Sequence, residues 1–149
     1  MVTLKFERYF IERFSFKENE NFETESDTLD VDFFPNVEIN ILEDDSSAVI
    51  FLNCKLGDET KKNCPFTGEV SLTGIFECEF NKDDVEDMSI ASELLTQNSI
   101  SILFPYLRSF ISDMTLRTNK FPAFILPPFN IIDMLKNEDL IKINRLSSN

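Results

Sequence analysis

The stretch GEVSLTGIFECEFNKDDVEDMSIASELL, residues 68–95, decides the fold, because its apolar pattern changes period once. Apolar side chains first recur at every second residue, from Val70 to Phe80, which is typical of a strand with one covered face. After Asp84 they recur at helical spacing, behind acidic residues of the kind that favour a helix N-terminus. The stretch therefore predicts a strand that gives way to a short helix.

Three more strands are predicted before this stretch. Residues 4–16 alternate charged and apolar side chains, and residues 37–42 and 48–56 alternate on either side of a turn-forming EDDSS sequence. Residues 17–32 are too polar to be buried and predict a long loop or crossover. Strands joined by short turns pair antiparallel. We therefore predict an α+β fold, a four-stranded antiparallel sheet followed by a long helix and a shorter C-terminal helix.

The C-terminal third predicts the two helices of this fold. Ser99 or Ser101 can cap the long helix, which extends to about Asn119 and holds Pro105 in its early turns. The proline-rich residues 121–129 predict an extended linker into a final helix over residues 131–143. The length fits a single domain, residues 1–149, with a variable polar tail from about residue 137.

The composition argues against catalysis. The chain has no His to serve as a general base or metal ligand, and its three Gly cannot form a phosphate-binding loop. Three Cys are too few for a structural zinc site and cannot all pair with one another. We expect reduced thiols, with Cys54 and Cys78 buried in strands and Cys64 in a loop where it can be exposed. We therefore predict a protein that is not an enzyme and has no cofactor and no metal.

The charge and the aromatic content predict the kind of partner. A net charge of −13 repels nucleic acids and anionic membranes, so we expect neither as a partner. No apolar run reaches membrane-spanning length, and we expect a soluble, cytoplasmic protein. Sixteen Phe in a chain of ordinary apolar content predict that some aromatic area forms a contact surface for other polypeptides.

Several short motifs resemble those of the SecB family of export chaperones. The sequence ILFPY at residues 102–106, followed by Arg108, resembles the start of the family's main helix. The motifs FPNV (34–37), LGDET (56–60), GIF (74–76), FP (121–122) and LPPFN (126–130) follow in the family's order. The resemblance implies an ATP-independent holdase that binds unfolded client polypeptides. It also implies self-association as a dimer or as a tetramer, a dimer of dimers with long helices between the sheets.

The resemblance also implies where partners bind. Carried over, the polypeptide-binding groove has two walls, and its residues are Phe34, Val37, Ile39, Ile41, Phe124, Leu126, Phe129, Ile132 and Leu135. The oligomer interface falls on the long helix, at Phe104, Leu107, Ile111, Met114 and Leu116. Binding in such a groove depends on buried apolar area, about 25 cal/mol per Å², and tolerates many sequences.

The chain departs from the family where export members dock a SecA-type motor through acidic residues. Arg13 and Lys17 occupy two of these positions, and only Glu69 keeps the acidic sign. A charge reversal at a docking patch weakens association. A general or export-linked holdase and a dedicated chaperone of a toxin-antitoxin module, with an antitoxin as its client, therefore remain alternatives. A third alternative is an adaptor that binds one folded partner.

Overall fold

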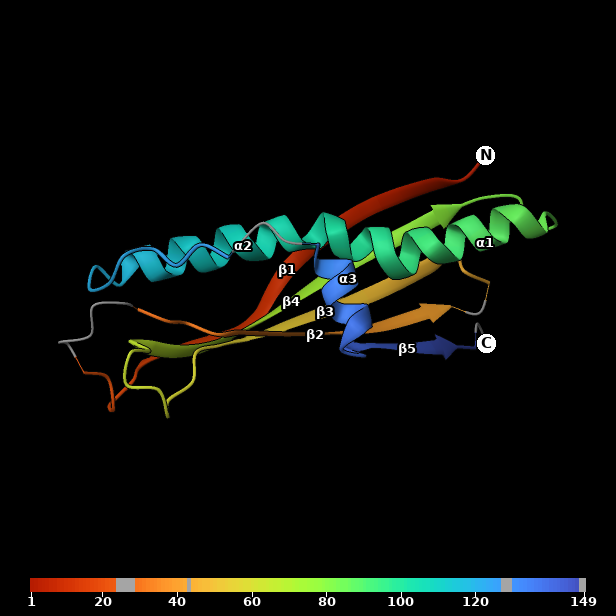
Figure 1. Cartoon of the computed structure of the whole chain (residues 1–149). Helices are drawn as coiled ribbons and strands as arrows, with labels where there is room; N and C mark the ends of the chain where they lie inside the picture. The colour runs from red at the N-terminus through yellow and green to blue at the C-terminus, as the bar shows by residue number, and fades with distance from the viewer. Residues whose placement is uncertain (24–28, 43, 127–129, 148–149) are drawn as a thin grey trace.

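The protein is a mixed five-stranded sheet with its helices on one face (Figure 1). The structure, a computed structural model, describes residues 1–23, 29–42, 44–126 and 130–147. The strands are β1 (Thr3–Glu18), β2 (Phe33–Leu42), β3 (Ser47–Leu56), β4 (Phe66–Glu79) and β5 (Ile141–Leu146). Their order across the sheet is β1-β4-β3-β2-β5, so β1 and β5 form its two edges.

The first four strands pair antiparallel, which confirms the predicted sheet. The fifth strand was not predicted, and it pairs parallel with β2. The final helix, α3 (Ile131–Asn137), is shorter than predicted and ends before it reaches residue 143. Asp139 has a positive φ of 55°, and the Leu140 amide donates to the Leu135 carbonyl, so the chain turns back to the sheet. The predicted polar tail thus contributes a strand.

Two bulges give β1 its aromatic face. The pairing of β1 with β4 shifts between Phe6 and Arg8 and again between Ile11 and Arg13. Each bulge inserts one extra residue, so Tyr9 and Ile11 lie on the same face as Phe6 and Phe14. Strict alternation over residues 4–16 would have placed Arg8 and Glu12 on that face instead. The bulges therefore keep these charges off the apolar side of the strand.

The long helical segment is continuous rather than two separate helices. It consists of α1 (Val85–Glu93), a π-helical turn η1 (Leu94–Asn98) and α2 (Ser99–Arg117). Asp84 caps α1 by accepting from the Glu86 and Asp87 amides, as the acidic start predicted. Ser99 is not a cap, because its hydroxyl donates to the Leu95 carbonyl at 2.6 Å inside the continuous helix. Pro105 consequently lies in the helix interior.

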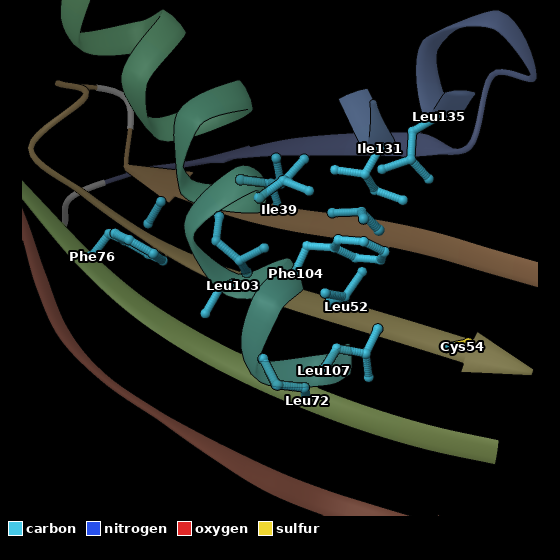
Figure 2. Packing of buried hydrophobic residues seen from close by; sticks show 14 of the residues in the cluster. Ile39, Leu52, Cys54, Leu72, Phe76, Leu103, Phe104, Leu107, Ile131 and Leu135 are labelled. Atoms are coloured by element: carbon cyan, nitrogen blue, oxygen red, sulfur yellow. The ribbon is translucent and has the colours of Figure 1, made fainter. Parts of the chain in front are cut away.

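The core lies between the helices and the sheet (Figure 2). Leu103 and Leu107 of α2 cover Leu52 and Leu72, while Ile131 and Leu135 of α3 lie over β2. Gly74 makes room for the helix, because a Cβ there would lie 2.6 Å from both Leu103 δ-carbons. The long helix α2 and the short helix α3 therefore pack on the sheet through one shared apolar layer.

The structure describes the two ends of the connection between β1 and β2, residues 19–23 and 29–32. Both ends are held to the loop that joins β3 and β4, where the Asn19 amide side chain donates to the Lys61 and Cys64 carbonyls. Lys61 pairs with Asp32 at 2.7 Å and Asp30 at 3.4 Å. Among the described residues, no helix combines the length and apolar character needed to cross a membrane.

Candidate polypeptide-binding surfaces

An aromatic groove runs between strand β1 and helix α2. From β1, Tyr9 and Phe14 face α2 and are 40% and 55% exposed. From α2, Tyr106 lies 4.4 Å from the Tyr9 ring centre, and Phe110 meets Phe14 edge-on at 5.4 Å. These aromatic pairs join the two walls, yet much of their area remains open to solvent. We call this surface the β1 groove.

The β1 groove contains two hollows, and Phe110 lines both. One has a volume of about 240 Å³ and is lined mainly by apolar groups, among them Phe14, Phe16, Val70 and Met114. The other, about 430 Å³, lies between Tyr9 and Leu116. Leu116 is 59% exposed at its rim. The groove can therefore accept apolar side chains of another polypeptide on either side of Phe110.

Most of the predicted oligomer interface lies elsewhere. Phe104, Leu107 and Ile111 are at most 5% exposed and form the stripe of α2 that packs on the sheet. Met114 and Leu116 lie at the groove, and the buried Ile111 also lines its smaller hollow. A helix presents one apolar stripe of limited width to a sheet, and the exposed aromatic residues of α2 flank that stripe.

The sequence analysis did not predict that Tyr9, Phe14 and Tyr106 are exposed at a groove. The charges at Arg8 and Glu12 were the signal that β1 is bulged.

The predicted polypeptide-binding residues do not form one groove. Within the chain, Val37, Ile39, Ile41, Leu126 and Leu135 are at most 2% exposed and belong to the core. Their burial has a physical cause, because Ile131 and Leu135 of α3 lie over the helix side of β2 and Leu126 belongs to the same core. Phe124 and Ile132 are only partly buried against this core. Phe129 lies outside the described residues.

Phe34 faces away from the other predicted binding residues. Side chains alternate along β2, so Phe34 points to the helix-free face of the sheet while Val37 and Ile39 point to the helices. It is 51% exposed and lines a shallow hollow with Lys17 and Lys55. One client segment therefore cannot contact Phe34 and Phe124 from the same side of the sheet.

A second set of exposed apolar groups lies on the described linker residues, α3 and β5, and we call it the α3 surface. Ile125 in the linker is 64% exposed, next to Phe124, whose amide donates to the Thr115 hydroxyl at 2.8 Å. The Arg108 Nε fixes the same linker by donating to the Leu126 carbonyl at 3.1 Å. On the other side of α3, a cleft of about 210 Å³ is lined by η1, α3 and β5, including Leu135 and Ile143. Ile125, Ile132 and Ile143 are thus the apolar groups this surface offers to solvent.

The predicted docking acid, Glu69, is paired. It accepts from Arg13 at 3.3 Å on the helix-free face, where Arg13 and Lys17 extend from neighbouring β1. Within the described residues, Lys17 and Lys55 have no carboxylate within ion-pair distance. The pair satisfies both charges locally, so this patch offers an acidic partner-binding group only after the Arg13 contact opens.

The three thiols are all buried and unpaired. Burial raises the pKa of the Cys54 thiol far above its ordinary value, and burial also raises that of Cys78. Cys64, predicted to lie in a loop where it can be exposed, is fully buried and donates to the Phe66 carbonyl at 3.1 Å. The thiols therefore serve as small packing groups.

These features define a class of protein: an α+β domain with one long helix on a sheet and uncovered apolar surfaces on both sides of that helix. The sequence model of one family, described as preprotein translocase subunit SecB, matches residues 1–139. The chain belongs to the SecB family. Membership of this family of chaperones supports a chaperone role.

Three known proteins are similar to the chain in part or in fold. A stretch of 45 residues is 47% identical to the uncharacterized protein MJ0357 of Methanocaldococcus jannaschii, and it spans only 28% of that protein. The fold matches the Mycobacterium tuberculosis Rv1957 SecB-like chaperone, solved with a ChAD peptide from the Rv1956 HigA1 antitoxin. That match has a TM-score of 0.59 and 19% identity and covers 85% of this chain and 90% of the other. A Streptococcus agalactiae protein of unknown function matches with a TM-score of 0.46 and 14% identity, over 85% of this chain and 98% of the other.

Proposed function

We propose that the protein is a holdase, which binds non-native polypeptides without nucleotide and keeps them from aggregating. The observation that carries the proposal is the pair of separate apolar surfaces on one acidic chain. The β1 groove exposes Phe14 and Leu116, and the α3 surface exposes Ile125 and Ile143. A net charge of −13 keeps such a chain dispersed while these surfaces stay free.

We assign self-association to the β1 groove. Its walls are aromatic and preformed, and its hollows suit the side chains of a folded neighbour. The outer backbone edge of β1 runs alongside the groove from Tyr9 to Phe16, so a second copy can contact strand and groove together. Of the predicted interface residues, Met114 and Leu116 serve this contact.

We assign clients to the α3 surface. It is less aromatic, and it lies beside a linker and a short edge strand rather than between two long rigid elements. Of the predicted binding residues, Phe124 and Ile132 serve it directly. Leu126, Leu135 and the three β2 residues support it from the core beneath. Such a surface recognises apolar area rather than a fixed sequence.

The test is suppression of aggregation of several unrelated, chemically unfolded proteins, without nucleotide and at equimolar chain. The wild type is expected to suppress light scattering for each of them. Ile125→Asp with Ile132→Asp is expected to lose most of this activity, because both charges enter the apolar contact area. Phe34→Asp is the matched control on the opposite sheet face and should behave as wild type. Equal loss in both variants would contradict the assignment.

A dedicated chaperone with one client is the second candidate, and the Arg13–Glu69 pair favours it over an export role. The similar M. tuberculosis chaperone was solved with an antitoxin peptide. The affinity of this protein for an antitoxin peptide should therefore be compared with its affinity for unrelated unfolded chains. A dedicated chaperone would bind one peptide at least about a hundredfold more tightly than unrelated unfolded chains, a difference of about 2.7 kcal/mol. Similar affinities for all of them would instead support the general holdase.

A further inference from the structure

Strand β5 occupies the backbone edge of β2, and its contacts there show which kind of segment this edge can bind. The Val37 amide donates to the Leu140 carbonyl at 2.9 Å, and residues 37–42 then pair in parallel with residues 141–146. Along β5, Ile141 and Ile143 point to the helix side and line the cleft beside α3. The edge therefore holds an extended segment with apolar side chains at alternate positions.

Polar groups on β2 and in the turn after it recognise the far end of the segment. The Asn144 side chain donates to Glu38 at 2.7 Å and to Asn40 at 2.9 Å. Arg145 donates to the Asp45 carboxylate at 2.6 Å and to the Ser92 hydroxyl at 3.2 Å. The Asp45 side chain is only 9% exposed, which makes it a built partner for a cation. The site thus selects a segment with alternate apolar residues followed by a basic residue.

Strand β5 is less buried than β2, the strand beside it. All six residues of β5 are partly or fully exposed, and only Ile141 packs against the core. The helix-side residues of β2, by contrast, are covered by α3 as well as by β5. The core therefore persists when β5 leaves, while the backbone edge of β2, the cleft and Asp45 become free.

We propose that β5 is an internal occupant of a client-binding site on the β2 edge. Extended client segments that alternate apolar residues and carry a basic residue displace it and pair with β2. This proposal rests on the holdase function above and names its client chemistry and its regulation. Because β5 is tethered, its effective concentration is of the order of mM, so only segments that bind well replace it.

The test locks β5 in place in the full chain. Asn40 and Asn144 are directly paired, and neighbouring strands lie about 4.8 Å apart, within the Cα separation that a disulfide spans. Asn40→Cys with Asn144→Cys therefore closes the edge on oxidation and opens it on reduction. The native thiols are buried, and Asn144→Cys alone under the same oxidant is the control. Asn144→Ala with Arg145→Ala provides a form in which β5 is loosened.

The probe is a labelled peptide with the sequence of residues 141–147, IKINRLS, alongside a version with Arg145→Glu. The loosened form should bind IKINRLS about tenfold more tightly than wild type, and the oxidised lock at least about tenfold more weakly. Reduction should restore binding, and the Glu peptide should bind weakly throughout. Equal affinity in the oxidised and reduced lock would overturn the proposal, and this comparison stands even if the loosened form unfolds.

Aggregation suppression separates this proposal from the function on which it rests. If wild type suppresses aggregation and oxidation of the lock has no effect on it, clients bind elsewhere and the β2-edge proposal fails while the holdase stands. If no form suppresses aggregation, the holdase fails. The peptide affinities then still decide whether the β2 edge accepts a strand in trans.

Discussion

Along β1, at one edge of the sheet, helix-facing side chains remain in solvent, whereas along β2, next to the opposite edge, they are buried. Phe14 on β1 is 55% exposed, but Ile39 and Ile41 on β2 are fully buried. Both strands place apolar residues on the helix side, so the difference does not come from the strands themselves. It comes from what lies beside them: α3 and β5 cover β2, while Tyr106 and Phe110 on one flank of α2 contact β1.

The difference separates two tasks that one apolar surface would have to share. An aromatic groove beside a long rigid strand suits a contact that stays closed, and a surface made of a linker, a short helix and a lightly held strand suits exchange. The chain can therefore associate with itself through one edge and still expose a binding surface at the other. A substitution at one of these surfaces can therefore be tested without altering the other.

The largest expected effect is on stability along the buried face of β2. Ile39→Ala removes a fully buried side chain beneath α3 and should lower the free energy of unfolding by about 2–4 kcal/mol. Phe34→Ala changes the same strand on its exposed face and should cost less than about 1 kcal/mol. Denaturation in urea measures both. Similar losses for the two would show that the burial difference along β2 does not govern stability.

The β2 strand also shows how far sequence reasoning reaches. Alternation at Val37, Ile39 and Ile41 correctly predicted a strand with one covered face, and the order of strands and helices followed from similar patterns. The same alternation could not say whether the cover is the chain's own helix or a client. That depends on where α3 packs on the sheet, which no local pattern encodes.

Two features of the sheet could not be predicted from local patterns. IKINRL at residues 141–146 has a strand-like alternation, but it follows an apolar run of helical spacing and was taken into the helix. Its strand state depends on β2, which is about a hundred residues away in sequence. In β1, the bulges moved Tyr9 and Ile11 to the aromatic face, which strict period-two counting cannot reproduce.

The next effect concerns self-association at the open edge. Phe14→Asp places a charge in the β1 groove and should weaken association by about 2–4 kcal/mol, or roughly 30-fold to 1000-fold. Phe10 is the matched control, because it lies on the same strand, is 39% exposed and faces the helix-free side. Phe10→Asp should therefore leave association unchanged. Sedimentation over a range of concentrations measures both, and equal weakening would place the interface on the sheet face.

A smaller effect is expected in the opening of β5. Asn144→Ala removes both side-chain hydrogen bonds to β2 and should favour opening by about 1 kcal/mol, which speeds amide exchange in residues 141–146 about fivefold. Exchange in β3 should not change. Lys142→Ala, on the same face of β5, is the control because no described residue pairs with its charge. Faster exchange across the whole sheet would mean that β5 is integral to the core and would count against its displacement.

The smallest effect is a pH dependence in the turn after β2. Hydrogen bonds from the Ser46 hydroxyl and from Lys82 lower the pKa of Asp44 from 3.8 to about 2. Because the folded pKa lies below the unfolded value, the ionised Asp44 stabilises the fold above about pH 4, and this contribution is lost as the pH falls through about 2. Asp44→Asn should remove that part of the acid sensitivity. Urea denaturation across this range should show the wild type losing more stability than the variant; parallel curves would mean that the turn adds nothing to the pH dependence. The side chain is partly exposed, so the difference should be small and should shrink further with added salt.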